Sequence, residues 1–145
     1  MVDVTGKDTT LREAIARGTV IMQPRTVEAI ETGEVSKGDV FGVARVAGIM
    51  AAKKTSDIIP MCHPLELTGI KLYFSSDSTK GEITIEASVK TIGRTGVEME
   101  AMTAVGVAAL TIYDMCKSAD REIVLSDIKL LKKSGGKSGT FTRAE

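Results

Sequence analysis

Residues 95–117, TGVEMEAMTAVGVAALTIYDMCK, decide the fold of this chain, because they carry its strongest helical pattern. Between residues 101 and 113 almost every position is apolar or small, so the predicted helix has no polar side. A helix of this kind has to be buried on more than one side. Its own sheet can cover one side, and in a chain of 145 residues we expect another subunit to cover the other.

Two alternating stretches precede this helix and predict strands. Residues 67–74 and 82–92 place apolar side chains at alternate positions, and a polar loop separates them, which is typical of an antiparallel hairpin. Pro24 and Gly33 bracket a short predicted helix at 26–32. The other predicted elements are a helix at 40–54, capped by Asp39, and a strand at 123–131.

The remaining segments are predicted to be largely irregular. The start of the chain holds two short β-like pieces, at 2–4 and 19–22, around a polar segment. Residues 58–65 contain two prolines, which suit a rigid loop, and the tail 132–139 is too rich in glycine to be regular. The order of elements predicts one α+β domain over residues 1–145, with helices packed on one face of an antiparallel sheet.

The composition excludes several classes of protein. Nineteen basic and nineteen acidic residues cancel, which argues against a general affinity for nucleic acid or for an anionic membrane. One histidine and two cysteines are too few for a classical zinc site or a disulfide scaffold, so no metal is predicted. The apolar stretches are interrupted before membrane-spanning length, and no signal sequence is evident. We therefore expect a cytoplasmic protein.

Charged residues occur only at the two ends of the long predicted helix. Glu98 and Glu100 lie in the first turn and Lys117 in the last, where the helix dipole favours them, and this ordinary explanation is preferred for Glu98. Asp114 opposes the dipole, so it needs a partner or a function. Lys117, about 60° away around the helix, can supply the partner. A structural ion pair and a catalytic pair are equally compatible with this pattern.

Glu100 and Asp114 are separated by about 21 Å of helix, so one small substrate cannot touch both within a single chain. Two such helices packed antiparallel across a two-fold axis would bring the start of one beside the end of the other. The sequence therefore predicts a site shared between subunits.

The remaining polar candidates are weaker. His63 is the only histidine, and a lone histidine is most often incidental. Cys62 beside it should point the other way, which argues against a thiolate–imidazolium pair.

The tail contains Gly136-Lys137-Ser138, which is how a phosphate-binding loop ends. However, Leu131 occupies the place of the first glycine, and too few residues follow for a helix. Composition alone favours a frayed tail there. The other basic candidates for an anion are Lys37, Lys53, Lys54, Lys132 and Lys133.

Seven blocks carry a resemblance over nearly the whole chain: MVDV (1–4), KGDV (37–40), ARVAGI (44–49), IPMCHPL (59–65), TGVEMEA (95–101), LTIYDMCK (110–117) and KSGGKSG (133–139). The family they resemble is that of the cyclic pyranopterin monophosphate synthases (molybdenum cofactor biosynthesis protein C). Departures are mild: Met61 and Met102 stand where leucine is expected, and Gly106 where serine is common.

The resemblance implies a ferredoxin-like fold, assembled as a hexamer from three dimers with active sites between subunits. It also implies a reaction: 3′,8-cyclo-7,8-dihydro-GTP is rearranged to cyclic pyranopterin monophosphate, and pyrophosphate is released. No cofactor is expected, although magnesium could accompany the triphosphate.

The resemblance further assigns residues to roles. Asp114 and Lys117 would be the acid–base pair, and Lys37 a further catalytic lysine. The substrate would be contacted by Met61, Cys62, His63, Glu98, Met99 and Glu100, and its triphosphate by Lys133, Lys7, Arg12 and Lys137.

Two other functions compete with this one. A catalytically silent oligomer that binds a nucleotide or phosphorylated metabolite would carry the same basic groups. A ferredoxin-like RNA-binding module would need exposed aromatic residues on its sheet and a basic charge balance, and this chain has neither.

Overall fold

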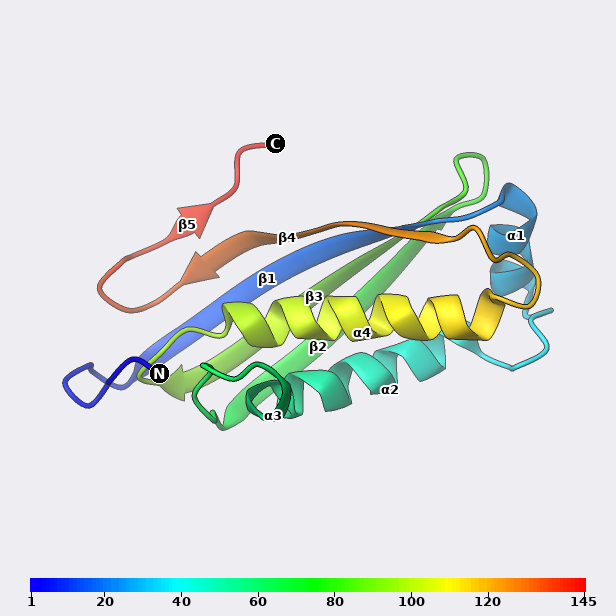
Figure 1. The fold of residues 1–145 in the computed structure, drawn as a ribbon. Helices are drawn as coiled ribbons and strands as arrows, with labels where there is room; N and C mark the ends of the chain where they lie inside the picture. Colours follow the sequence, from blue (N-terminus) through cyan, green and yellow to red (C-terminus); the bar gives the residue numbers. More distant parts are fainter.

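A computed structural model describes all 145 residues and shows an α+β fold (Figure 1). Its sheet has the strand order β2-β3-β1-β4-β5, and every neighbouring pair is antiparallel. The first four strands and the helices between them follow the β-α-β-β-α-β order of a ferredoxin-like fold, as predicted. The elements are β1 (Thr10–Ile21), α1 (Pro24–Thr32), α2 (Val40–Lys53), α3 (Thr55–Ile58), β2 (Leu67–Asp77), β3 (Glu82–Gly93), α4 (Glu98–Cys116), β4 (Val124–Ser134) and β5 (Phe141–Thr142).

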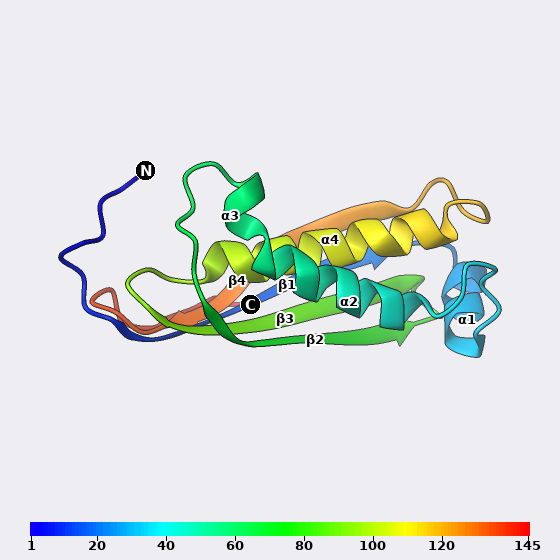
Figure 2. The same ribbon diagram turned by 90° about the horizontal axis from the view of Figure 1, so that it is seen from below.

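Helices α2 and α4 lie side by side on one face of the sheet, which confirms the predicted layers (Figure 2). Small residues let these layers approach closely. A Cβ on Gly18 of β1 would lie 2.7 Å from Val105 Cγ1 of α4, so only glycine fits under the helix there. A Cβ on Gly48 of α2 would lie 2.5 Å from Leu72 Cδ2 and 3.0 Å from the Ala104 carbonyl oxygen. The core is therefore built around α4 at short distances.

Local signals predicted several elements correctly. Asp39 caps α2, because its carboxylate accepts a hydrogen bond of 3.1 Å from the Gly42 N–H. Gly33 ends α1 with φ of 75°, a left-handed conformation that glycine adopts without strain. The 67–92 region forms the predicted antiparallel hairpin.

The prediction for the start of the chain was wrong. Residues 10–21 form the long central strand β1, in place of two short pieces around a polar segment. The strand does alternate, but its inward positions include Ala14, Ala16 and Gly18, which are too small to stand out as apolar. Arg12 also points inward and is only 8% exposed.

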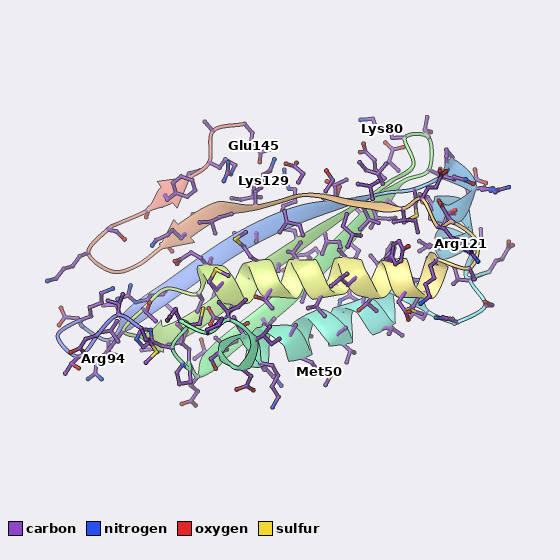
Figure 3. The ribbon with its side chains drawn as sticks, in the orientation of Figure 1. Met50, Lys80, Arg94, Arg121, Lys129 and Glu145 are labelled. Carbon is purple, nitrogen blue, oxygen red and sulfur yellow. The ribbon has the colours of Figure 1, made fainter.

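The tail is also more regular than its composition indicates. Strand β4 extends through Ser134, and β5 pairs back onto it at Lys132 and Lys133. The glycines serve a hairpin turn, since Gly135 and Gly136 have φ of 96° and 78°. The end of the chain then folds over the sheet, where Glu145 lies 3.8 Å from Lys129 (Figure 3). The expected frayed tail is therefore wrong.

Helix α4 meets the length and hydropathy of a membrane span, contrary to the expectation that no stretch would. Half of that span is buried within the domain, as in a core helix of a globular protein. The outer side of α4 remains open, with Leu110 57% exposed. Neighbouring α2 exposes Val46 and Met50, and Figure 3 shows Met50 pointing away from the domain. One chain thus leaves an apolar strip on α2 and α4 uncovered.

Candidate active site

The predicted site residues gather at the two opposite ends of α4. The helix begins beside the N-terminus and the turn between β4 and β5, and it ends beside α1 (Figure 1). The three predicted catalytic residues lie at its C-terminal end, and all the predicted substrate-binding residues lie at its N-terminal end.

At the C-terminal end of α4, two lysines hold one carboxylate. Lys117 Nζ lies 2.8 Å from Asp114 Oδ1, within one turn of the helix. Lys37 Nζ lies 3.3 Å from Asp114 Oδ2 and donates to the Asp114 carbonyl oxygen at 3.0 Å. Lys37 reaches this point because α1 ends at Gly33 and the following turn runs back toward α4. We call Lys37, Asp114 and Lys117 the Lys-Asp-Lys cluster.

The charges of this cluster stabilise one another. The hydrogen bond from Lys117, and then that from Lys37, lowers the pKa of the Asp114 carboxyl below its ordinary value. The Asp114 carboxylate in turn raises the pKa of Lys117. These shifts favour the charged forms, a carboxylate on Asp114 and an ammonium group on Lys117, so the cluster pairs a proton acceptor with a proton donor, each weaker in that role than the free side chain. The predicted partner of Asp114 is confirmed, and Lys37 is a second one.

At the N-terminal end of α4, a cleft of about 500 Å³ opens beside the segment 61–63. His63 Nε2 lies 2.7 Å from the Val2 carbonyl oxygen, which places the N-terminal segment across the cleft. The cleft is lined by Met1, Val2, Val4, Lys7, Met61, Cys62, His63, Leu65, Thr95, Gly96, Glu98, Met99 and Glu100. All six residues that the resemblance assigned to contact with the substrate outside its triphosphate are among them.

Burial sets the protonation behaviour of this cleft. Glu100 is only 4% exposed, and this burial raises the pKa of its carboxyl, with the charge of Glu98 as a smaller cause in the same direction. Burial, and then the charge of Glu100, raises the pKa of the Cys62 thiol. Cys62 is therefore held as a thiol and is not poised as a nucleophile, in line with the argument against a Cys62–His63 pair.

A second cleft of about 570 Å³ adjoins the first and has a polar lining with four basic side chains, those of Lys7, Arg12, Lys133 and Lys137. Lys133 Nζ lies 3.7 Å from Glu98 Oε1, so this ion pair joins the two clefts. Arg12 is fixed by the hydrogen bond of 3.0 Å from its Nε to the Gly93 carbonyl oxygen. Fixed guanidinium and ammonium groups of this kind suit a polyphosphate.

The two ends of α4 cannot serve one substrate within a single chain, because Asp114 lies sixteen residues after Glu98, which corresponds to about 24 Å of helix.

No group of three or more His, Cys, Asp or Glu side chains in the structure lies close enough together to hold a metal ion.

Comparison with known proteins identifies the family. The model of the MoaC family matches residues 1–136. The chain belongs to the MoaC family. It is 63% identical over 143 residues to the cyclic pyranopterin monophosphate synthase of Pelotomaculum thermopropionicum, covering 99% of this chain and 84% of that protein. It is 59% identical over 145 residues to the protein of the same name from Heliobacterium modesticaldum, covering 100% of this chain and 91% of the relative.

Sequence reasoning missed part of the site of this MoaC family member. Val2 and Val4 line the first cleft, and Thr10 and Ser138 line the second. The block at residues 1–4 was a signal for the first pair, because it is one of the stretches that carry the resemblance. Lys53 and Lys54, named as candidates for an anion, line neither cleft; Lys54 lies 3.9 Å from Asp57.

Proposed function

We propose that this chain converts 3′,8-cyclo-7,8-dihydro-GTP to cyclic pyranopterin monophosphate and pyrophosphate, a lyase reaction of molybdenum cofactor biosynthesis. Membership of the MoaC family and the shared name of its relatives support this function. The observation that carries it in the structure is the Lys-Asp-Lys cluster, which two separate segments of the chain assemble.

The reaction needs proton transfers during ring opening and ring closure, and the Lys-Asp-Lys cluster is the group we assign to them. Lys37 and Lys117 would donate protons to leaving nitrogen and oxygen atoms, and Asp114 would hold both lysines in place and accept a proton in return. Mutual contact holds these side chains together before substrate arrives, which is the arrangement that favours acid–base catalysis.

The two clefts at the other end of α4 would hold the substrate. The carboxylates of Glu98 and Glu100 would accept from the paired N–H donors of a guanine-like edge. Met99, Met61, Cys62 and His63 line the same cleft and would contact the substrate too. In the second cleft, the basic side chains would hold the triphosphate. When the cyclic phosphate closes, an oxygen bonds to the α-phosphorus and the bond to pyrophosphate breaks, so these cations would stabilise the departing charge.

The active site would then be completed by a second copy of the chain. Antiparallel pairing of the uncovered sides of α4 would bring the Lys-Asp-Lys cluster of one subunit to the clefts of its partner. The exposed Leu110 and Met50 support a contact on this side. We propose a hexamer built from three such dimers, acting in the cytoplasm on a small-molecule substrate, without nucleic acid or membrane as partner.

No resident cofactor is proposed, since the basic side chains of the second cleft can meet the triphosphate charge themselves. Magnesium would act, if at all, as an ion carried by the triphosphate. Turnover that persists in EDTA would support this proposal, and a metal ion that stays bound to the dialysed protein without substrate and is needed for turnover would contradict it.

The proposed function is tested by incubating the protein with the cyclised GTP derivative and measuring pyrophosphate and an oxidisable fluorescent pterin. Both products should form, and both should fall sharply in Asp114→Asn and Lys37→Ala. The matched control is Asp57→Asn, because Asp57 also pairs with a lysine but lies outside both clefts and the cluster. Tight binding without products would identify a silent binder and overturn the proposal.

A further inference from the structure

Asp120 is a buried carboxylate that the proposed chemistry does not use. It lies in the turn after α4 and is only 4% exposed. Its backbone N–H donates to the Cys116 carbonyl oxygen at 3.1 Å, which ties the turn to the last residues of the helix. Charged groups are rarely buried to this extent without a set of partners, so the contacts of its carboxylate are informative.

The carboxylate of Asp120 binds the start of α1. Oδ2 accepts a hydrogen bond of 2.9 Å from the Gln23 N–H and one of 3.3 Å from the Thr26 hydroxyl. Oδ1 accepts from the Glu122 N–H at 3.1 Å. Gln23 is the N-cap residue of α1, but its own side chain makes no capping bond, and the first turn of α1 holds no acidic residue. Asp120 therefore supplies, from 97 residues away, an acceptor for the N–H of the N-cap residue and an acidic side chain at the start of α1, which α1 lacks locally.

Packing between α1 and the end of α4 is incomplete. A cleft of about 320 Å³ that is open to solvent lies between them, and its lining includes Ala29 and Val35 on one side and Met115 and Cys116 on the other. Val27 and Ile30 pack α1 into the core, but no filled core joins α1 to the end of α4. The hydrogen bonds of Asp120 are a polar connection beside that cleft.

The two elements that Asp120 connects, α1 and the end of α4, also carry or adjoin the residues of the Lys-Asp-Lys cluster. Asp114 and Lys117 sit on the last turns of α4, while Lys37 sits on the turn that follows α1. The position of Lys37 relative to Asp114 thus depends on how α1 is held against the end of α4. We propose that Asp120 is a positioning residue, which acts through α1 to keep Lys37 in contact with Asp114. This inference rests on the proposed function.

The test compares Asp120→Ala with two substitutions of Thr26, in the full-length protein and with the cyclised GTP derivative as substrate. Asp120→Ala should lower kcat by roughly 10- to 100-fold and leave KM unchanged, because the substitution displaces a catalytic lysine and Asp120 lines neither cleft. Thr26→Val removes one hydrogen bond and should lower kcat less, whereas Thr26→Ser keeps the hydroxyl and should restore it.

Hydrogen exchange gives a second readout that is independent of turnover. The Gly38 N–H donates to the Val35 carbonyl oxygen at 3.0 Å, so its exchange reports on the turn that carries Lys37. Its exchange should accelerate in Asp120→Ala, while the Cys62 N–H, bonded to Ile59 at 3.1 Å, should keep its rate. Ile85→Val, a fully buried change in β3, is the control for general loss of stability and should alter neither kcat nor the Gly38 exchange.

The outcomes separate the two proposals. If the unmodified protein forms no product, the proposed function fails, whatever Asp120 does to exchange. If the unmodified protein is active and Asp120→Ala keeps its kcat, or lowers kcat only as much as Ile85→Val does, the positioning role is wrong and the function stands. Should Asp120→Ala not fold, the difference between Thr26→Val and Thr26→Ser decides in its place.

Discussion

Replacing Gly136 by alanine should weaken binding of the triphosphate through an indirect effect on Arg12. Gly136 has φ of 78°, and a Cβ added there would overlap Arg12 Nη1. A non-glycine residue in the left-handed region costs about 1–2 kcal/mol of stability. The guanidinium must also move away from the second cleft, where we propose that it meets a phosphate.

The size of the binding effect follows from the contact that is lost. A hydrogen bond to a charged group contributes about 1.5–3 kcal/mol, so losing the contact of Arg12 should weaken affinity by roughly 10- to 100-fold. Gly139→Ala is the matched control, because Gly139 has φ of 71° but no heavy atom lies within 4 Å of its added Cβ. It should show the same loss of stability with no loss of affinity.

Two measurements test this comparison. Urea unfolding should give similar losses of stability for Gly136→Ala and Gly139→Ala, and calorimetric titration with pyrophosphate or inorganic triphosphate should show weaker binding only for Gly136→Ala. KM for the cyclised GTP derivative should rise in parallel. Equal affinity of both variants and the unmodified protein would refute the reasoning, because Arg12 would then not be a phosphate ligand.

Three other perturbations have outcomes that the structure specifies. Burial raises the pKa of Glu100, so its ionised form costs stability at neutral pH; Glu100→Gln should raise the urea midpoint at pH 7, and the gain should vanish as the pH falls below about 4.5, where the unfolded state also protonates. A midpoint gain independent of pH would contradict that cause. Leu110→Glu should shift the sedimentation of the protein toward the monomer and abolish turnover without unfolding it, since Leu110 is 57% exposed in one chain; an unchanged oligomer would exclude the proposed contact. Asp39→Ala removes the cap bond to Gly42 and should lower the free energy of unfolding by about 1 kcal/mol, while Asp39→Asn should retain most of it.

Sequence reasoning succeeded where the signal is local. The cap at Asp39 and the alternating hairpin at 67–92 depend on neighbours within a few residues, and both are confirmed. It failed for β1, because a strand is recognised by large apolar side chains, and Ala14 and Gly18 have none. Those positions must be small because α4 packs directly on them, which is a tertiary requirement.

The same division holds for the candidate site. The types of residue and the helix spacing of Asp114 and Lys117 are properties of the sequence, since three residues along a helix place two side chains within reach. The contact of Lys37 with Asp114 joins residues 77 apart, and the hydrogen bond from the Gln23 N–H to Asp120 joins residues 97 apart. Such pairs form only when turns and packed layers set the path of the chain between them. Residue chemistry and local elements were therefore determined by the sequence itself, whereas the tertiary structure alone decided which distant charges meet.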